Sequence, residues 1–445
     1  MPESRADTPP VTAVPDAAMP PRQLLRALFD TAVDAVTAER CIPADSVGEP
    51  VAGRTLIVAV GKAAAAMASV AAGMVPGSLS GLVITRHGHS GPPHHLPSDF
   101  EVIEAGHPVP DADSLAAATR ALALVRRLGP EDRLLALVSG GGSALLTLPV
   151  PGVSLADKQA VTRALLRSGA TIAEINSVRK HLSTVKGGRL AVAAAPARVT
   201  TLIISDVPGD DPSFVASGPT VADHTTLETA REILAHHRIA LPENVAAALD
   251  DPANETPAPA MVRGEVLVVA RARDALVAAT RLAEDQGYAV TDLGDHLEGE
   301  ARQLGAEHAA LALQLAADGR AHAILSGGET TVRVTNPDGR GGRNLEYLLG
   351  LAIALDGAPR IHAIACDTDG IDGTEDNAGA IVAPDTLARA RTLGLDAQAM
   401  LDANQAYPFF EALGDLIVTG PTRTNVNDLR AILIAPEGAD QHCTL

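Results

Sequence analysis

The sequence Leu-Leu-Ala-Leu-Val-Ser-Gly-Gly-Gly-Ser, residues 134–143, joins an apolar run to a glycine-rich turn. Five apolar residues in succession are typical of a strand that is buried on both faces of a parallel sheet. The same order of apolar run and polar turn recurs at residues 56–62 and 201–206. Repeated strand, turn and helix units predict an α/β protein with a doubly wound, Rossmann-like parallel sheet.

The length of the chain indicates two domains. Its 445 residues, 46% apolar and 20% charged, exceed what one ordinary hydrophobic core organises. Residues 250–264 are rich in Pro and small polar residues, which predicts a linker. We therefore expect a disordered segment at 1–20, a larger Rossmann-like domain at 21–258 and a smaller α/β domain at 259–445.

The second domain is expected to contain a mixed sheet. An apolar run at residues 266–269 predicts its first strand, and runs at 323–325 and 362–365 end in turns rich in Gly or Asp. Two further apolar runs, at 416–418 and 431–434, flank a polar loop. This arrangement suggests antiparallel strands that the loop connects.

Composition excludes several classes of function. Three Tyr, five Phe and no Trp offer little for base stacking, and a formal charge of −19 opposes a polyanion, so we expect no nucleic-acid partner. Three cysteines without a CxxC pair fit a reducing cytoplasm and exclude a thiolate metal cage. The chain shows neither a signal-peptide core nor a run of membrane-spanning length, so we expect a cytoplasmic protein without a membrane partner.

Lysine is rare in this chain, and its positions therefore matter. Of 35 cationic residues, only four are lysines: Lys62, Lys158, Lys180 and Lys186. Lys62 follows Gly61 at a predicted strand-to-helix turn, where an ammonium group and backbone amides could hold a phosphate. The turn is not a Walker A loop, because Ala63 stands where that motif requires a hydroxyl residue. A solvated lysine at a helix start is the alternative.

Two glycine-rich turns follow predicted strands, one in each domain. Consecutive glycines let backbone N–H groups approach an anion without obstruction by a Cβ atom. The first turn is not a dinucleotide fingerprint, because Leu145 occupies the place of the third glycine. Tight turn geometry alone is the alternative. The candidate anion-binding residues are Ser139, Gly140, Gly141, Gly142, Ser143, Ser326, Gly327, Gly328 and Glu329.

The densest positive charge of the chain lies on an expected helix that Asn176 or Ser177 would cap. Arg179 and Lys186 would lie on one face of that helix, and Lys180 lies beside them. A basic patch in an acidic protein attracts an anionic substrate or nucleotide. A solvated helix face is the alternative interpretation.

Acidic residues follow two of the predicted strands. Asp206 comes after the first, and Asp367 and Asp369 come after the second. Such carboxylates suit Mg²⁺, which takes one or two acidic ligands together with phosphate oxygens and water. Capping of ordinary Asx turns is the alternative. A separate group of histidines, formed by His87, His89, His94 and His95, lacks the spacing that is typical of a metal site.

The turn at residues 339–344, Gly-Arg-Gly-Gly-Arg-Asn, places two arginines and Asn344 before a predicted helix. A guanidinium group there would clamp a carboxylate or a phosphoryl group in transfer through two parallel hydrogen bonds. Arg340 and Arg343 both remain candidates.

With these segments assembled, the chain resembles the class II glycerate 2-kinases, a family with DUF4147 and MOFRL domains that is often labelled hydroxypyruvate reductase. The resemblance runs from about residue 24 to residue 434. Its most specific motifs are AVGKAA at 59–64, EAGHPVPD at 104–111, SGGGSALL at 139–146, INSVRKHLSTVKGGRLA at 175–191, ISDVPGDDPSFVASGPT at 204–220, SGGETTV at 326–332, GRGGRNLE at 339–346, ACDTDGIDG at 365–373 and TGPTRTNVNDL at 419–429.

The resemblance implies ATP- and Mg²⁺-dependent phosphorylation of D-glycerate at its 2-hydroxyl, in a cleft between a Rossmann-like domain and a MOFRL-type domain. It implies Lys62 and either Arg340 or Arg343 as active-site residues. Asp206, with Asp367 or Asp369, would bind Mg²⁺ or accept the hydroxyl proton. The expected partners are glycerate and ATP, and the oligomeric state is left open, a homo-oligomer included.

Two rival functions belong to other classes. A hydroxypyruvate reductase dependent on NAD(P)H would need a dinucleotide site, for which the chain shows no glycine fingerprint. A non-catalytic protein that senses phosphosugars would need the glycine turns and the basic patch, but not the paired acids at strand ends.

Overall fold

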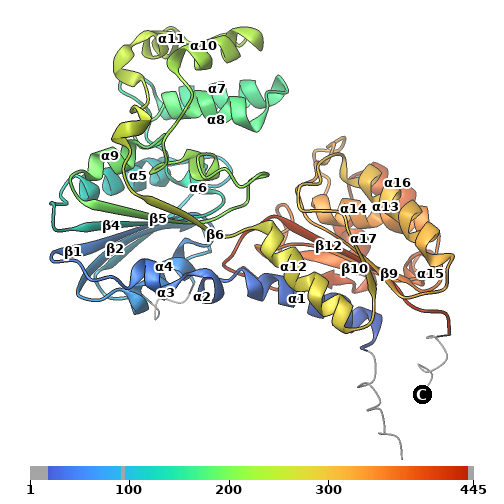
Figure 1. The fold of residues 1–445 in the computed structure, drawn as a ribbon. Helices are drawn as coiled ribbons and strands as arrows, with labels where there is room; N and C mark the ends of the chain where they lie inside the picture. Colours follow the sequence, from blue (N-terminus) through green and yellow to red (C-terminus); the bar gives the residue numbers. More distant parts are fainter. Residues whose placement is uncertain (1–18, 92–95, 439–445) are drawn as a thin grey trace, which may run out of the picture.

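The computed structural model describes residues 19–91 and 96–438, so the expected disordered segment 1–20 lies almost wholly outside the described residues. Two sheets of six strands each form the frame of the molecule (Figure 1). Helices pack on both faces of each sheet. The expectation of two α/β domains is confirmed.

All six strands of the first sheet are parallel, in the order β3-β2-β1-β4-β5-β6. Doubly wound dinucleotide-binding folds have this order, which changes direction between β1 and β4, and ligands bind beyond the carboxyl ends of strands at such a switch point. The predicted Rossmann-like sheet is confirmed. Its strands are β1 (Arg54–Val60), β2 (Ser78–Arg86), β3 (Phe100–Ala105), β4 (Arg133–Val138), β5 (Arg198–Ile204) and β6 (Glu265–Ala270).

Helices enclose the first sheet and form a further layer above it (Figure 1). One face packs against α2 (Ala38–Cys41), α3 (Ala44–Val47) and α4 (Ala64–Met74). The other face packs against α5 (Ala112–Val125), α6 (Gly142–Leu145) and α9 (Arg189–Ala194). A separate apolar cluster joins α7 (Leu155–Arg167), α8 (Ile172–His181), α10 (Leu227–His236) and α11 (Glu243–Asp250).

The basic helix begins earlier than the sequence suggested. Thr171 caps α8, because its side chain accepts a hydrogen bond from the backbone N–H of Glu174 while the Glu174 carboxylate accepts one from Thr171 N. Asn176 and Ser177 therefore lie inside the helix, and their predicted capping role was wrong. The helix ends at His181, before Lys186 is reached.

The second sheet is mixed, as predicted. Only β7 and β8 pair in parallel, and the order is β11-β10-β9-β12-β8-β7. The strands are β7 (Ala289–Asp292), β8 (His322–Ser326), β9 (Ile361–Asp367), β10 (Gly379–Val382), β11 (Leu416–Ile417) and β12 (Asp428–Ile434). The strands on either side of the polar loop run antiparallel, as predicted, but they do not pair with each other, because β11 lies at the sheet edge beside β10 whereas β12 lies between β9 and β8.

Each face of the second sheet carries its own helices. One face packs against α13 (Ala301–Ala316), α14 (Arg343–Leu355), α15 (Thr386–Thr392), α16 (Ala397–Asp402) and α17 (Ala406–Leu413). The other packs against α1 (Pro21–Ala35) and α12 (Ala272–Asp285), which lie side by side (Figure 1). No helix in the described part of the chain is long and apolar enough to cross a lipid bilayer.

The predicted domain boundary at 258/259 was wrong in two respects. The segment 250–264 contains two short 3-10 turns, Pro252–Asn254 and Pro259–Met261, but β6 follows it and pairs with β5 of the first sheet. Moreover, α1 buries its apolar face, including Leu24 and Leu28, against the second sheet. The chain therefore crosses between the domains before β1 and again after β6. The helix α1 was expected in the first domain but packs on the second sheet, and β6 was expected in the second domain but pairs within the first sheet.

Candidate active site

Hydrogen bonds join the turns after β1 and β4 at the switch point of the first sheet. Lys62 N donates to Gly140 O at 2.9 Å, and Ala63 N donates to Ser139 Oγ at 3.1 Å. Gly61 has a φ of +125°, and a Cβ atom at Gly61 would overlap Ser139. The Gly-Lys turn and the first glycine turn thus form one continuous surface.

Gly140 allows an acidic side chain to approach the backbone of the first glycine turn. A Cβ atom at Gly140 would overlap the Asp206 carboxylate and the Asn425 amide. The N–H groups of Gly140 and Gly141 have no hydrogen-bond acceptor among the residues that the structure describes. Unpaired backbone amides beside these polar side chains are suited to an anion. Asn425 belongs to the second domain, and we refer to this meeting of the two domains as the cleft.

The Lys62 side chain reaches from the first domain to the second. Its Nζ donates to Asp369 Oδ2 at 2.5 Å, and only 14% of the side chain is exposed. Burial lowers the pKa of Lys62, but the nearby carboxylates of Asp369 and Asp367 outweigh it, so the net shift is upward. Lys62 is therefore protonated and paired, which rules out a solvated lysine at the helix start.

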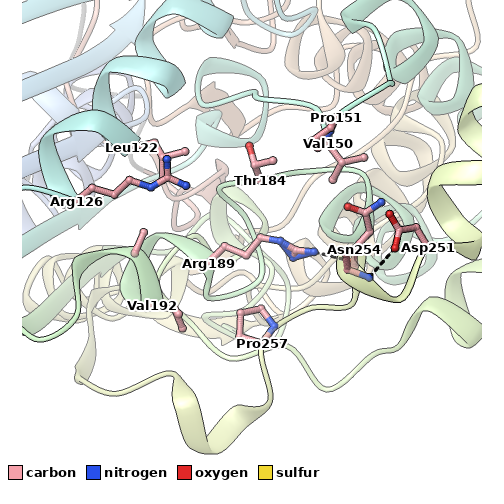
Figure 2. A pocket seen from close by; sticks show the side chains of 12 residues that line it. Leu122, Arg126, Val150, Pro151, Thr184, Arg189, Val192, Asp251, Asn254 and Pro257 are labelled. Carbon is pink, nitrogen blue, oxygen red and sulfur yellow. Dashed lines mark hydrogen bonds between the residues drawn. The ribbon is translucent and has the colours of Figure 1, made fainter.

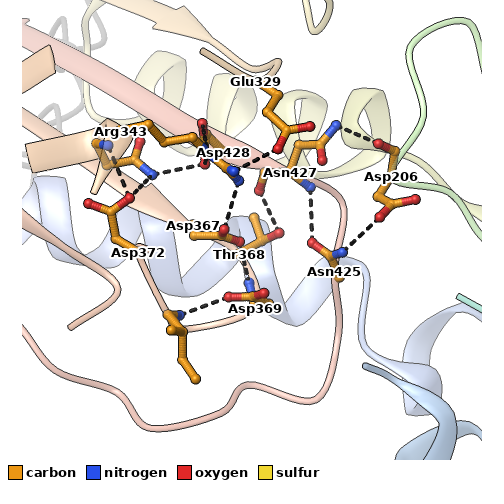
Figure 3. A network of polar contacts seen from close by, with 12 residues as sticks. Asp206, Glu329, Arg343, Asp367, Thr368, Asp369, Asp372, Asn425, Asn427 and Asp428 are labelled. Carbon is orange, nitrogen blue, oxygen red and sulfur yellow. Dashed lines mark hydrogen bonds and ion pairs between the residues drawn. The ribbon is translucent and has the colours of Figure 1, made fainter. Parts of the chain in front are cut away.

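Three carboxylates surround Arg343, the first residue of α14 (Figure 3). Its Nε pairs with Asp428 at 2.9 Å, its Nη1 with Glu329 at 2.6 Å and its Nη2 with Asp367 at 2.8 Å. Two of these acids meet because the register of β9 and β12 places Asp367 directly opposite Asp428. The second domain thus presents an arginine in the middle of an acidic network.

Arg340 lies outside this network, although it is only three residues away. Its guanidinium group pairs with Glu375 at 2.9 Å, lies 4.5 Å from the centre of the Tyr407 ring, and is about half exposed. The structure therefore brings Arg343, and not Arg340, to the acids beside Lys62.

Asn344 supports the network from behind. It is fully buried, its Nδ2 donates to Asp428 Oδ1 at 2.8 Å, and its N donates to Asp372 Oδ1 at 3.1 Å. Burial raises the pKa of Asp372 to about 7. Asn344 therefore orients Asp428, and its direct contact with a ligand stays a prediction.

Asp206 follows β5 and faces the second domain (Figure 3). Its Oδ2 accepts from Asn425 Nδ2 at 3.0 Å, and its backbone oxygen accepts from Asn427 Nδ2 at 2.7 Å. Burial raises the pKa of Asp206 to about 6, although the charge of Lys62 opposes the shift. Among the described residues, no side chain donates a hydrogen bond to Asp206 Oδ1, so this oxygen can accept a proton.

The second glycine turn does not form the expected anion cradle. Gly327 N donates to Gly294 O at 2.9 Å, and its carbonyl oxygen accepts from Arg430 at 3.0 Å. A Cβ atom at Gly328 would overlap the backbone of Leu297. These glycines permit close packing of two backbone segments. Ser326 is buried at the end of β8, so the turn contributes only Glu329 to the acidic network.

The basic residues near α8 separate into two environments. Lys180 pairs with Asp223 at 3.1 Å, and both side chains are almost fully buried. Its ammonium group therefore forms a buried ion pair within the first domain, and its role in ligand binding stays a prediction. Arg179 and Lys186 instead line a cavity that also contacts Ser143.

A buried chain of hydrogen bonds positions Ser143. Asn176 Oδ1 accepts from Ser217 Oγ at 2.9 Å, and Ser217 Oγ lies 2.8 Å from Ser143 Oγ. Gly142 leaves room for this segment, since its Cβ atom would lie only 2.7 Å from the Ala216 side chain. Asn176 therefore acts through Ser143, and its predicted direct contact with ligand is corrected.

Besides Asp372, Asp428 and Arg430 of the acidic network, three further residues of the site were missed from the sequence. Asn425 and Asn427 precede β12 and bind Asp206 across the cleft. His107 lies against the first glycine turn, because a Cβ atom at Gly141 would be 3.1 Å from its ring, and burial lowers its pKa to about 3. These residues lie within recognisable motifs of the sequence, but no sequence pattern predicted which groups their side chains contact.

A hollow of about 490 Å³ lies in the first domain, away from the residues described above (Figure 2). Arg126 and Arg189 line it, but Arg189 already donates to the carbonyl oxygen of Asn254 at 2.6 Å. No residue at the carboxyl end of a strand contributes to this hollow. Its position away from the switch point distinguishes it from the candidate active site.

Among the described residues, one group of three ligand atoms lies close enough to surround a metal ion, formed by His87, Asp111 and Asp113. Asp111 also caps α5, and the group is largely exposed. His94 and His95 lie outside the described residues. Among the described residues, the acids beside Lys62 do not form a closed group of this kind. Mg²⁺ does not require one, because it keeps several water ligands.

The cleft has more acidic than basic side chains. A phosphate would be repelled there unless a divalent cation balanced the charge. Burial and the charge of Asp369 raise the pKa of Asp367 to about 6, and a bound cation would stabilise both carboxylates. These oxygen donors fit Mg²⁺. The acids are Asp206, Glu329, Asp367, Asp369, Asp372 and Asp428, and the cations are Lys62, Arg343 and Arg430.

Two family models match the chain, one in each half. Residues 24–250 match a domain of unknown function, DUF4147, and residues 322–428 match the MOFRL family. Together these regions contain Lys62, Asp206, Arg343 and Asp369, the residues that meet at the cleft.

Similar proteins carry two kinds of name. A protein of Agrobacterium vitis named putative hydroxypyruvate reductase is 53% identical over 93% of this chain and 94% of its own. The D-glycerate 2-kinase of Thermotoga maritima is 41% identical over 84% of this chain and 89% of its own. A crystal structure of glycerate kinase from Thermotoga maritima matches with a TM-score of 0.83 at 39% identity, covering 93% of this chain and 99% of that one.

Proposed function

This chain belongs to the class II glycerate 2-kinase family, and on that premise we propose that it transfers the γ-phosphoryl group of ATP to the 2-hydroxyl of D-glycerate. The observation that carries the proposal is the meeting of Lys62 with Asp369 across the cleft, beside Arg343 and Asp206. Phosphoryl transfer needs positioned cations, a group that orients the hydroxyl, and neutralised phosphate charge. The cleft contains side chains for each task.

Arg343 is proposed to bind the glycerate carboxylate. Of its three acidic partners, Glu329 is half exposed, whereas Asp367 and Asp428 are buried. The substrate carboxylate would therefore replace Glu329 at Arg343 Nη1. Lys62 would then balance the charge on the phosphoryl group in transfer, because a compact ammonium group serves as a point charge for phosphate.

Asp206 is proposed to accept the proton of the 2-hydroxyl. The hydroxyl oxygen forms a bond to the γ-phosphorus, the bond from that phosphorus to the β–γ bridging oxygen breaks, and ADP leaves. A base with a pKa near 6 is suited to this task at neutral pH. Asp367 and Asp369 would bind Mg²⁺, which neutralises phosphate charge when bound.

A coupled assay tests the proposal directly. ADP formation from ATP, Mg²⁺ and D-glycerate is expected, and ³¹P NMR is expected to identify the product as 2-phosphoglycerate. Production of 3-phosphoglycerate would contradict the proposed 2-hydroxyl acceptor. Binding of glycerate and ATP without turnover would instead favour a regulatory protein.

A hydroxypyruvate reductase is the second candidate, because a relative more than 50% identical has that name. The first strand-to-helix turn argues against it. In dinucleotide-binding folds this turn approaches the pyrophosphate through several glycines, whereas here Gly61 is followed by Lys62. NADH oxidation with hydroxypyruvate, measured without ATP, would support the reductase.

The pH dependence of the reaction is predicted to report on Asp206. Its pKa of about 6 means that the carboxyl group is protonated below that pH and cannot accept the hydroxyl proton. We expect kcat/KM for glycerate to fall by about tenfold per pH unit below pH 6, and to be constant above it. Steady-state rates between pH 4.5 and 8 measure this.

Two variants identify the group responsible. Asp206→Asn is expected to lose activity by about 100- to 1,000-fold and to show a flatter acid limb in its residual rate. Asp210→Asn is the matched control, because Asp210 lies in the same loop and pairs only with Arg271, at 3.7 Å. An unchanged acid limb in Asp206→Asn would assign the proton transfer to another residue.

A further inference from the structure

A cavity of about 300 Å³ lies in the first domain, between the first glycine turn and the helices α7 and α8. Gly141 and Ser143 line it on the side of the turn. None of the described residues that line it is acidic. Its cationic lining consists of Lys158, Arg163, Arg179 and Lys186.

No acidic side chain in the described part of the chain pairs with the cations of this cavity. Lys158 Nζ donates only to the backbone oxygens of Arg179 and Leu182, at 3.3 and 3.0 Å, and Lys186 Nζ donates only to Ala216 O, at 3.2 Å. The Arg179 guanidinium group has no side-chain partner among the described residues. Both lysines are almost fully buried. Unpaired buried charge destabilises a protein, so an anionic ligand is the natural complement to these side chains.

Mutual repulsion adds to the effect of burial. Burial, together with smaller contributions from the charges of Arg179 and Arg189, lowers the pKa of Lys158 to about 7. Burial also lowers the pKa of Lys186 well below its usual value, with smaller contributions from Lys158 and Arg179. A bound anion would reverse these shifts, because it favours the protonated form of each lysine.

The cleft has the opposite character. Lys62 pairs with Asp369, and Arg343 pairs with three carboxylates. Cations already paired with acids, in a site with excess negative charge, are suited to a metal-bound ligand. Unpaired cations in a site without acids are suited to the metal-free part of a polyanion.

We propose that the basic cavity binds the phosphate chain of a nucleoside triphosphate, and that the chain passes Gly141 to reach Lys62. A Cβ atom at Gly141 would lie 3.4 Å from Lys62 Cγ, so this glycine separates the cavity from the cleft without blocking the path. This proposal rests on the proposed function in one point, since both take the nucleotide to be the phosphoryl donor.

Size and lining favour a nucleotide over glycerate. One carboxylate would balance one of the four cations of the cavity, whereas a triphosphate can balance several of them. Val109 and Leu166 also line the cavity and are 56% and 58% exposed, so they offer an apolar surface for a base. A cavity of about 300 Å³ is within the range for small-molecule sites.

Equilibrium binding to the full chain tests the proposal without requiring turnover. Calorimetric titration with ADP and with inorganic tripolyphosphate is expected to show about 10- to 100-fold weaker binding for Lys158→Met and Arg179→Met. Arg167→Met is the control, because Arg167 is an exposed arginine of α7 that does not line the cavity. Arg167→Met is expected to bind both ligands as the unmodified chain does.

Proton uptake provides a second readout that a purely structural role would not change. At pH 8 Lys158 is largely neutral in the free protein, so binding of ADP or tripolyphosphate should take up about one proton at Lys158, in addition to proton uptake at Lys186. Titrations in buffers of different ionisation enthalpy measure this uptake. Lys158→Met is expected to reduce it, whereas Arg167→Met is expected to leave it unchanged.

The outcomes separate this proposal from the proposed function. If Arg179→Met and Lys158→Met raised the KM for glycerate while ADP bound normally, the cavity would be the glycerate site and the proposal would be overturned. Normal ADP binding without proton uptake would also overturn it. Weak ADP binding in these variants of a chain that phosphorylates no glycerate would support the cavity and reject the glycerate reaction.

Discussion

Lys62→Met is expected to lower kcat/KM for glycerate by about a thousandfold, in the range of losses that follow removal of a preorganised charge from an active site. Lys62 is the one lysine of the chain that pairs with an acid of the other domain, Asp369, at 2.5 Å. Methionine retains the length of the side chain but removes the charge. Steady-state kinetics with saturating ATP measure the loss.

The loss should appear in the rate rather than in nucleotide affinity. Lys62 lies outside the basic cavity, so Lys62→Met is expected to bind ADP within about threefold of the unmodified chain. Lys62→Arg should restore little activity, because a planar guanidinium group does not replace a compact ammonium group. Near-normal kcat/KM in Lys62→Met would refute the central catalytic assignment.

Arg343→Met and Arg340→Met are expected to differ by at least about a hundredfold in kcat/KM. Arg343 lies among the acids beside Lys62, whereas Arg340 pairs with Glu375 at the surface. Arg343→Met should raise the KM for glycerate strongly, because its guanidinium group is the proposed carboxylate clamp. Arg340→Met is the matched control and should remain within about twofold of the unmodified chain.

Loss of folding must be separated from loss of function in Arg343→Met. Removal of Arg343 leaves Asp367 buried without its paired arginine and leaves Asp428 with Arg430 as its remaining cation, which is expected to cost about 3–5 kcal/mol of stability. Thermal unfolding therefore accompanies the kinetics. Glu329→Gln provides an independent test, because glycerate would no longer displace a charged carboxylate and its KM should fall. An unchanged or raised KM in Glu329→Gln would contradict the proposed carboxylate site.

The periodic pattern of the chain predicted the parallel sheet correctly because each strand is a local run of apolar residues. The runs at 56–60 and 134–138 correspond to the central strands β1 and β4, and the turns after both lie at the switch point. The importance of Lys62 was also accessible from the sequence, since it is one of only four lysines. These features depend on neighbours along the chain.

Other predictions failed where contacts between distant segments decide the outcome. The linker composition at 250–264 did not reveal that the next strand, β6, pairs with β5. Lys180 and Lys186 looked alike in one basic segment, yet Asp223 neutralises Lys180 whereas no acid reaches Lys186. The second glycine turn looked like the first, but its glycines make room for another backbone segment.

The sequence by itself determined the strands, the turns and the residue types available for phosphoryl transfer, because hydrophobic periodicity and turn chemistry are local properties. Only the tertiary structure decided which charges are neutralised. Arg343 was distinguished from Arg340 by the register of β9 and β12, which places Asp367 and Asp428 around Arg343, whereas Arg340 pairs with Glu375 outside this network. The energy of a buried charge depends on the partners that folding brings next to it. These partners are far away along the chain, so local sequence patterns do not reveal them.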